Sequence, residues 1–309
     1  FRLSKPANGK STQVPNYVTN SGFTEEIPAR QKVGTPQDTY EHWIFDRQRD
    51  TFYQITLTGL EGLKDKPAFL QDYHRDTSAW DPQYKNVREV IISAPVYSDQ
   101  GKAVVTVRSL DNKDRWIALL NPETAALEQL DRQRDEAWIG GPGIGWTGAT
   151  GNLGWTADPQ KIWVQSEATG YSHLYTIDIN SKNKTALSSG PFEILSAELS
   201  RDKKWFYITS NKEGPNEQHF YRLPATGGPM EKITGKAGGY QVSLSPDEKW
   251  LAFRYSYSNQ PWELFIQPNQ AGAAAIQITQ STTEAFRAYP WKDPQIVRFK
   301  ARDGVEVPA

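Results

Sequence analysis

The fold is decided by the stretch Ser245-Pro246-Asp247-Glu248-Lys249 and the apolar run that follows it, Trp250–Tyr255, because the same layout recurs along the chain. Each copy is a polar turn that ends in lysine and leads into a run of apolar and aromatic residues. The lysines that end the four turns, 59, 43 and 45 residues apart, are Lys102, Lys161, Lys204 and Lys249. The last two spacings match the ~40–45 residues of a four-stranded propeller blade. The sequence therefore predicts a repeat protein.

Four short strands are predicted in each repeat. Runs rich in Val, Ile, Trp, Tyr and Thr that are bounded by Gly, Pro, Asn and Asp are typical of strands. In the last repeat these runs are Tyr240–Leu244, Trp250–Tyr255, Glu263–Gln267 and Ile276–Thr279. A lone four-stranded sheet cannot bury both of its faces, so such units must pack on one another. We therefore expect an all-β chain in which residues 36–295 form the four-stranded blades of a β-propeller.

The N-terminal third follows this period less closely. Residues 1–35 have no clear period and are expected to form an extended arm or a blade insertion. The candidate strands that follow are Tyr40–Asp46 and Thr51–Leu57, which predict a hairpin, and Lys66–Gln71 and Val87–Ile92, which belong to further blades. The longest spacing between turn lysines contains an insertion from Asp131 to Asn152. The chain thus holds about five blade equivalents.

Composition excludes several classes of function. Lys and Arg (35) and Asp and Glu (36) give a net charge of -1, whereas a nucleic-acid-binding protein needs a basic face. The absence of cysteine rules out disulfides and thiolate metal sites. The 4 histidines are isolated and show no zinc-ligand spacing, so no metal or other cofactor is expected. No run approaches the ~18 apolar residues of a membrane-spanning helix.

Two parts of the sequence resemble a known family. The segment Ser166-Glu167-Ala168-Thr169-Gly170-Tyr171-Ser172-His173-Leu174-Tyr175, preceded by Asp135–Gly143, resembles a propeller segment of the dipeptidyl-peptidase-IV-like members of the prolyl oligopeptidase family, in particular the bacterial ones. The tail Ile296–Ala309 is similar to the junction that leads into the catalytic α/β-hydrolase domain of that family. The resemblance implies a propeller of seven or eight blades, with blades upstream of Phe1. It also implies that residues 296–309 begin a linker strand into a missing hydrolase domain.

This resemblance implies a non-catalytic propeller that gates and positions peptide substrate for a serine exopeptidase cleaving N-terminal dipeptides. The chain contains no G-x-S-x-G nucleophile elbow, the strained turn that exposes the catalytic serine of an α/β-hydrolase, so we expect no activity from the chain itself. The implied partners are the peptide, the hydrolase domain of the same protein and a second copy in a homodimer. A periplasmic or secreted location is expected, with a cytoplasmic one left open. The alternative, from another class, is a stand-alone propeller that acts as a binding or scaffold module.

Glu25 and Glu26 are the candidate substrate-binding residues. In the dipeptidyl peptidase family two neighbouring glutamates of the propeller bind the ammonium group of the substrate, and carboxylates near a cation favour its charged form. The residues that flank Glu25 and Glu26 differ from the family's context for that motif. A solvated acidic pair on an exposed arm is therefore the competing interpretation.

Three further features have structural explanations. His173 is expected to be a structural histidine bonded to a neighbouring turn or to Glu167. The glycine-rich stretch 140–154 matches neither phosphate-loop pattern and is interpreted as a mobile insertion. Tryptophans that recur near the strand after the turn favour packing between blades, whereas those in predicted loops are expected on the surface. The first set is Trp163, Trp205 and Trp250, and the second is Trp138, Trp146 and Trp262.

Overall fold

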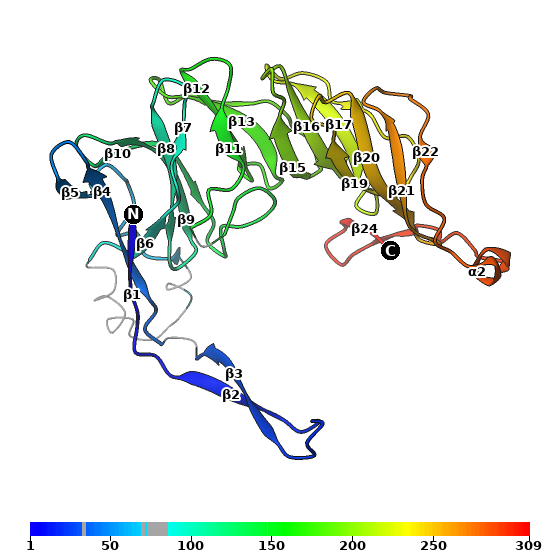
Figure 1. Ribbon diagram of the computed structural model, residues 1–309, viewed down its shortest axis with the longest axis horizontal. Helices are drawn as coiled ribbons and strands as arrows, with labels where there is room; N and C mark the ends of the chain where they lie inside the picture. Colours follow the sequence, from blue (N-terminus) through cyan, green and yellow to red (C-terminus); the bar gives the residue numbers. More distant parts are fainter. Residues whose placement is uncertain (33–34, 69–71, 73–85, 147) are drawn as a thin grey trace. The chain divides into compact units, whose positions relative to one another are not determined.

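The computed structural model describes residues 1–32, 35–68, 72, 86–146 and 148–309, which are almost entirely strands and turns (Figure 1). In this part of the chain no helix is long and apolar enough to cross a membrane. The described residues form two compact units. The first unit is Phe1–Gly140, Ile144–Trp155 and Ile177–Lys184, and the second is Gly141–Gly143, Thr156–Thr176 and Thr185–Ala309.

The repeats seen in the sequence are four-stranded antiparallel sheets whose strand order follows the chain: β11-β12-β13-β14, β15-β16-β17-β18 and β19-β20-β21-β22 (Figure 1). The predicted all-β propeller blades are thereby confirmed. The strands are β11 Leu153–Trp155, β12 Lys161–Ser166, β13 His173–Asp178, β14 Lys184–Ala186, β15 Ile194–Leu199, β16 Trp205–Ser210, β17 His219–Pro224, β18 Glu231–Lys232, β19 Gly239–Leu244, β20 Trp250–Tyr257, β21 Gln260–Pro268 and β22 Ile276–Gln277.

The polar turns have the capping chemistry that their sequence predicts. In the last repeat the hydroxyl of Ser245 accepts a hydrogen bond from the backbone N–H of Trp250 (3.0 Å), and the hydroxyl of Ser200 does the same for Trp205 one repeat earlier (3.0 Å). The residue before the turn lysine has positive φ in three repeats, at Gly101, Lys203 and Glu248. The turns that end at Lys102, Lys204 and Lys249 therefore combine a serine cap with a left-handed residue.

In the second unit, successive sheets pack face to face through alternate side chains. Leu251, Phe253 and Tyr255 of β20 are buried, while the residues between them are exposed. They form one cluster with Tyr207 and Phe220 of the preceding sheet. Another cluster joins Trp163 and Leu174 to Phe206, Ile208, Tyr221 and Leu223. Burial of apolar surface between sheets is the main stabilising contribution here.

The tryptophans that recur after the turns divide into buried and exposed positions. Trp163 is buried in the cluster just described, as expected for packing between blades. Trp205 is half-buried, with the guanidinium of Arg222 over its ring (4.8 Å). Trp250 is 47% exposed, which contradicts the packing prediction for this residue. It lies on the face of β20 opposite the buried residues, and no sheet of the described chain packs there.

The main sheet of the first unit has the order β10-β9-β8-β6, and β7 also pairs with β8. Two short strands, β6 and β7, thus pair with the same partner, β8. Residues 93–95 separate them, and the Ser93 hydroxyl accepts from the N–H of Thr106 (3.0 Å). Every residue of β8 is buried, so β8 is the centre of this unit. The strands are β6 Val90–Ile92, β7 Val96–Tyr97, β8 Ala103–Ser109, β9 Asp114–Asn121 and β10 Ala126–Arg134.

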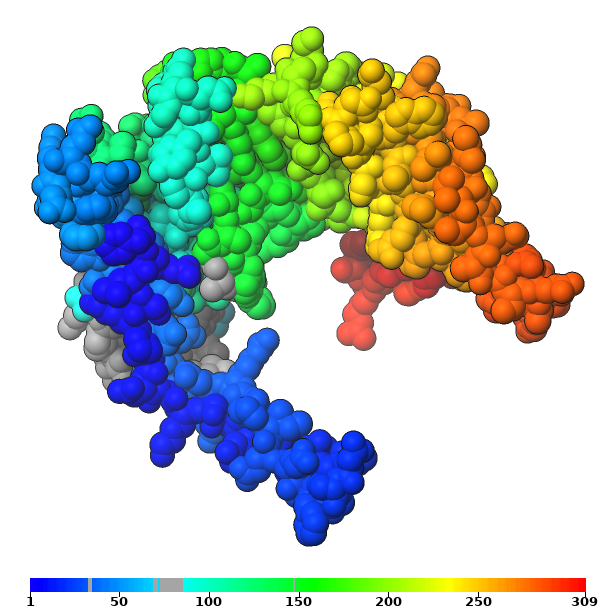
Figure 2. Space-filling model, in the orientation of Figure 1, coloured from blue at the N-terminus to red at the C-terminus, as the bar shows by residue number. Residues whose placement is uncertain are grey.

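The N-terminal residues form a small sheet and a separate hairpin. The predicted hairpin is confirmed as β4 Thr39–Asp46 and β5 Thr51–Gln54, and β1 Arg2–Lys5 pairs with β4. The hairpin of β2 Ser11–Asn16 and β3 Glu25–Gln31, blue in Figures 1 and 2, is a two-stranded sheet of its own. The strand expected at Lys66–Gln71 is not formed by Lys66–Ala68, and its remaining residues lie outside the described ones. The domain boundaries drawn from the sequence stay a prediction.

The chain after the last blade is short and largely exposed. α2, Glu284–Ala288, begins at Thr283, whose hydroxyl accepts from the N–H of Phe286. β23 Arg298–Lys300 and β24 Glu306–Pro308 form a hairpin whose turn contains Gly304 at positive φ. Asp303 and Gly304 thus lie at the tip of a hairpin.

Candidate functional site: the insertion after β10

The insertion between β10 and β11 exposes aromatic residues and lies against the hairpin of β8 and β9. The residues of this hairpin from Arg108 to Arg115 include five charged side chains. In sequence this stretch has the composition of a polar loop. In the structure most of its charged groups point back and bind the insertion. The insertion is described except for Thr147.

Arg108 is the first of these anchors. Its side chain is 5% exposed, and it donates to the backbone carbonyls of Ile139 and Gly145 (3.1 Å to the latter) and to the Asn112 side chain (3.1 Å). Burial lowers the pKa of Arg108 from its ordinary value. Its guanidinium also lies 4.9 Å from the ring centre of Trp146. One buried cation therefore fixes two carbonyls and one aromatic ring of the insertion.

Arg115 and Lys113 hold further carbonyls. Arg115 is 1% exposed, and burial lowers its pKa to about 10, so it remains charged at neutral pH. It donates to the carbonyl of Thr150 (2.9 Å) and to Gln133 (3.0 Å). The Lys113 ammonium donates to the carbonyls of Glu136 and Ala137 (2.7 Å to the latter). The insertion is thus bound along its backbone, and its interpretation as a mobile segment stays a prediction.

Asp114 is the centre of a second group of charged contacts in this hairpin. Its carboxylate is fully buried and accepts from Arg88 (2.7 Å), Arg132 (2.8 Å) and Arg134 (2.6 Å). Arg134 also binds Glu136 (2.8 Å), so the network extends into the insertion. Charge-assisted bonds of this kind are short and strong, and they replace the hydration that a carboxylate loses on burial. Asp114 and its three arginines therefore fix the start of the insertion.

The anchored insertion exposes two tryptophans beside each other. Trp138 is 55% exposed and Trp146 is 50% exposed, as the sequence predicts for both, and Trp262 is exposed as well (43%). The ring centres of Trp138 and Trp146 lie 4.9 Å apart, with an angle of 59° between the planes. Among the described residues, neither indole N–H has a hydrogen-bond acceptor. The indole of Trp155, by contrast, donates to the carbonyl of Val96 (3.0 Å).

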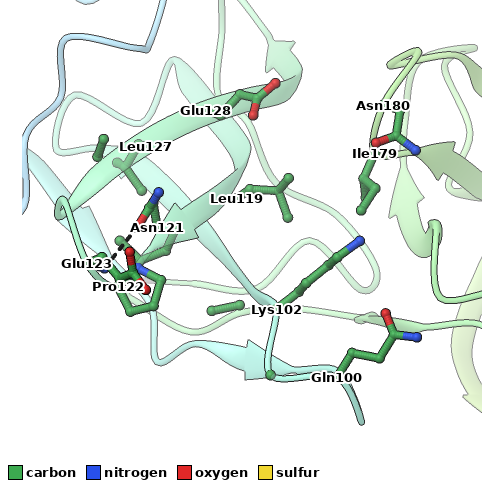
Figure 3. A pocket seen from close by; sticks show the side chains of 14 residues that line it. Gln100, Lys102, Leu119, Asn121, Pro122, Glu123, Leu127, Glu128, Ile179 and Asn180 are labelled. Carbon is green, nitrogen blue, oxygen red and sulfur yellow. Dashed lines mark hydrogen bonds between the residues drawn. The ribbon is translucent and has the colours of Figure 1, made fainter.

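A cavity of about 820 Å³ lies at the opposite end of the same sheet (Figure 3). It is bounded by the β7–β8 and β9–β10 turns, whereas the insertion follows the other end of β10. Leu119 and Ile179 give it apolar walls, and Lys102 extends into it. Glu128 on its rim is paired with Lys182 (3.1 Å). This mixture of charges does not select one ligand class, and the insertion is the better candidate site.

Glu25 and Glu26 lie on the exposed strand β3. They face Asn16 and Pro15 across the β2–β3 hairpin, and both are exposed. Among the described residues, no hydrogen bond or ion pair joins either glutamate to the insertion. Their assignment as substrate-binding residues stays a prediction.

His173 is a structural histidine, as expected, and belongs to a repeated arrangement. Its Nδ1 lies 3.0 Å from the Ser188 hydroxyl and its Nε2 lies 3.0 Å from the carbonyl of Gly190, rather than near Glu167. One blade later, Nδ1 of His219 lies 3.0 Å from the hydroxyl of Thr234. In both blades the hydroxyl also accepts from the backbone N–H after the histidine. A repeated, buried latch of this kind explains these histidines without catalysis.

Glu217 completes a constellation that resembles a catalytic triad. Its carboxylate lies 2.7 Å from Nε2 of His219, whose other nitrogen contacts Thr234. Thr234 is 1% exposed and already accepts a backbone N–H, so its hydroxyl is inaccessible to substrate. In the last blade Glu263 occupies the place of the histidine, and its carboxylate accepts a hydrogen bond from the Thr279 hydroxyl. In the described residues no group of acidic and histidine side chains is arranged to hold a metal ion.

The segment that resembles the family is buried at its two ends, at Ser166 and Ser172–Tyr175, and exposed between them, at Ala168–Tyr171. Ser172 donates through its hydroxyl to the carbonyl of Pro142 (2.8 Å), and its N–H donates to Glu193 (2.5 Å). Gln165 donates to the Ser172 hydroxyl (2.8 Å) and is fully buried. This segment of the second unit therefore fixes its own part of the insertion, Gly141–Gly143.

Solved structures share this fold. A crystal structure of dipeptidyl peptidase 4 from Porphyromonas gingivalis aligns over 99% of this chain and 39% of its own, with a TM-score of 0.67 and 14% identity. A putative dipeptidyl aminopeptidase IV from Bacteroides ovatus aligns over 100% of this chain and 41% of its own, with a TM-score of 0.64 and 12% identity. At such identities the likeness concerns the fold.

Relatives by sequence are peptidases from fungi. A probable dipeptidyl-aminopeptidase B of Aspergillus fumigatus is 30% identical over 102 residues, which cover 31% of this chain and 11% of the relative. Dipeptidyl peptidase 4 of Trichophyton rubrum is 21% identical over 219 residues, covering 70% of this chain and 24% of the relative. The chain therefore spans well under half the length of these proteins. Because these matches are fungal, the bacterial source expected from the sequence stays a prediction.

The family model for the dipeptidyl peptidase IV (DPP IV) N-terminal region matches residues 70–262, which include the strands from β6 to β20 and the anchored insertion. This range is more than half of the chain. The protein therefore belongs to the family of the dipeptidyl peptidase IV N-terminal region.

Proposed function

We propose that the chain is the propeller of a serine exopeptidase that removes dipeptides from peptide N-termini, and that it gates and positions the peptide for an α/β-hydrolase domain of the same protein. The observation that carries this proposal is the anchored insertion. Six buried or bound cations and one buried carboxylate hold a surface loop, which is costly unless the loop must keep one conformation. A loop held in this way is suited to positioning a substrate. The proposed location is the periplasm or the cell exterior.

The β2–β3 hairpin supports the proposed homodimer. Its strands pair with each other, and it exposes large apolar side chains at Tyr17 (75%), Val18 (91%) and Phe23 (78%). A two-stranded hairpin is at best marginally stable in water, and a group of exposed apolar residues is typical of an interaction surface. A second copy of the protein is the proposed partner. Glu25 and Glu26 lie on the same hairpin and remain the proposed ligands of the substrate ammonium group.

A comparison of two polypeptides tests the proposed activity. The full-length gene product and the 309-residue chain are each given a chromogenic Xaa-Pro dipeptide substrate. The full-length product is expected to release the chromophore and the chain alone to release none, because the chain has no nucleophile elbow. Release by the chain alone contradicts the non-catalytic role. Release by neither polypeptide favours a stand-alone binding module instead.

The gating role has a separate test in the same full-length product. Short peptides and a folded protein that begin with the same Xaa-Pro dipeptide are compared as substrates. A gate admits the peptides and excludes the folded protein. Equal cleavage of both would leave the peptidase assignment standing and remove the gating role.

A further inference from the structure

We propose that a cavity beside α2 binds the ring of a neutral sugar. The cavity, of about 330 Å³, lies within the second unit and is lined by the last sheet, by the loop before β19 and by residues 278–293, the α2 segment (orange in Figure 1). Its volume is at the lower end of the range for ligand pockets, which suits one or two sugar rings. The inference is independent of the proposed peptidase role, because it uses none of the residues that carry that role.

Four aromatic rings line this cavity. Tyr255 and Phe265 come from the sheet, with ring centres 5.9 Å apart and planes at 85°. Phe286 and Trp291 come from the α2 segment, with ring centres 4.8 Å apart. The negative face of an aromatic ring attracts C–H groups, and a sugar ring presents such groups on its faces. The larger cavity near Lys102 has no aromatic residue among the described residues that line it, so it lacks this feature.

The charges of the lining favour a neutral ligand. The Glu263 carboxylate accepts from the Thr279 hydroxyl and from the hydroxyl and N–H of Ser281 (2.7 and 2.6 Å), and these bonds lower the pKa of Glu263, which is therefore ionised at neutral pH. Lys236 and Arg287 line the same cavity, and in the described part of the chain neither is paired with a carboxylate. A small anion would be repelled by the glutamate, and a small cation by the other two residues. A hydroxyl group both donates and accepts, so it can bind charges of either sign.

Two amide side chains add further hydrogen-bonding groups. Gln260 and Gln280 line the cavity, and neither side chain has a hydrogen-bond partner among the described residues. A primary amide supplies two donors and one carbonyl acceptor. Aromatic rings, amides and both signs of charge in one cavity therefore match a ligand that has C–H faces and many hydroxyl groups.

The α2 segment is held in place before a ligand binds. Its start is fixed by the bonds from Ser281 to Glu263, and farther along the Asn259 side chain donates to Asp293. Within the segment, the indole of Trp291 donates to a backbone carbonyl of α2 (2.9 Å). A site that is formed before binding loses less conformational entropy when the ligand binds. This matters for a small ligand, which makes few contacts.

The experiment measures sugar binding to the 309-residue chain by ligand-observed NMR titration. The probes are methyl β-D-glucoside and methyl β-D-galactoside, each with a uronic-acid counterpart that carries a carboxylate and a 2-amino counterpart that carries an ammonium group. We expect at least one neutral glycoside to bind with a Kd of about 1–10 mM, and its two charged counterparts to bind about tenfold more weakly.

Variants show whether the cavity is the site. Gln280→Ala and Trp291→Ala should each weaken the neutral glycoside by about fivefold or more. Gln280→Ala breaks no bond of its side chain within the described protein, so its effect on affinity does not depend on a change in folding. Trp291→Phe keeps a ring and should retain part of the affinity.

Trp250→Ala is the matched control. Trp250 and Trp291 are both 47% exposed, but Trp250 does not line the cavity, so its replacement should leave the affinity unchanged. The proposal is overturned if neither neutral glycoside binds at roughly 10 mM, if a charged counterpart binds more tightly than its neutral parent, or if the Trp250 variant loses as much affinity as the Trp291 variant.

Discussion

Replacing Asp114 with asparagine perturbs the centre of the network that anchors the insertion. The Asp114 carboxylate is fully buried and accepts three guanidinium bonds of 2.6 to 2.8 Å. Asparagine keeps the size and one acceptor but removes the charge and directs an NH2 group toward an arginine. Loss of one partner from a buried ionic group costs about 3–5 kcal/mol.

The structure places the expected loss at the lower end of this range. The side chains of Arg132 and Arg134 are 21% and 22% exposed and keep Asp65 and Glu136 as partners, so they regain hydration when Asp114 loses its charge. Arg88 is 5% exposed and keeps Asp111. We expect Asp114→Asn to lower the free energy of unfolding by about 3 kcal/mol.

Urea unfolding followed by circular dichroism at neutral pH measures this change, and hydrogen exchange in β9 and β10 shows where it acts. Asp111→Asn is the matched control. Asp111 is 29% exposed and pairs with one arginine, so its replacement should cost about 1 kcal/mol or less. A loss for Asp114→Asn no larger than that of the control would refute the role given to the network.

Three further predictions concern stability. Burial lowers the pKa of His42 from its ordinary value of 6.5 to about 4, and Nε2 of the folded state accepts the Ile92 N–H (3.0 Å). As the pH falls, His42 of the unfolded chain therefore takes up a proton near pH 6.5, before His42 of the folded chain does. Stability should fall by about 3 kcal/mol as pH drops from 6.5 toward 4, and urea unfolding of His42→Gln at several pH values should show a smaller fall. Gly145→Ala should cost about 1–3 kcal/mol in the same assay, because its Cβ would meet the Gly151 nitrogen at 2.7 Å at a φ of +79°, whereas Gly170→Ala, with open space around it, should cost about 1 kcal/mol. His219→Ala should cost about 2–4 kcal/mol, since it removes a fully buried ring and the partner of a buried hydroxyl, and a cost below about 1 kcal/mol would contradict the latch.

The blades could be predicted from sequence because their determinants are local. A turn such as Ser245–Lys249 carries its own cap in the serine hydroxyl and its own left-handed residue in Glu248. The apolar runs that follow alternate in the way that half-buried strands require. These features act over a few residues, so period and composition reveal them.

The anchored insertion could not be predicted because its determinants are remote and depend on burial. Arg108 and Arg115 look like ordinary polar residues around a turn, and only packing shows that their charges are enclosed. Arg108 binds backbone carbonyls, and every residue has one, so the identities of the partner residues do not reveal these contacts. A usable signal was present for the histidine latch, because His173 and His219 share a place in their repeats, as do the hydroxyl residues Ser188 and Thr234.

The recurring tryptophans differ by one residue in their place after the turn. Trp163 is the second residue after its turn lysine and Trp250 is the first, and they are 7% and 47% exposed. Successive side chains of a strand point to opposite faces, so a shift of one residue places Trp163 in the core and Trp250 on the other face. Phe206 and Leu251 hold the place of Trp163 in the two following blades, and both are buried.

Steady-state kinetics of the full-length gene product test the central claim, that the insertion positions peptides for a peptidase. The measurement compares wild type with the Trp138→Ala, Trp146→Ala double variant on a chromogenic dipeptide and on a longer proline-containing peptide. The account predicts that kcat/KM for the longer peptide falls about tenfold while that for the dipeptide is unchanged, because only a peptide that extends beyond the cleaved dipeptide would use a positioning surface on the propeller. Equal losses on the two substrates, or no loss on either, would contradict it.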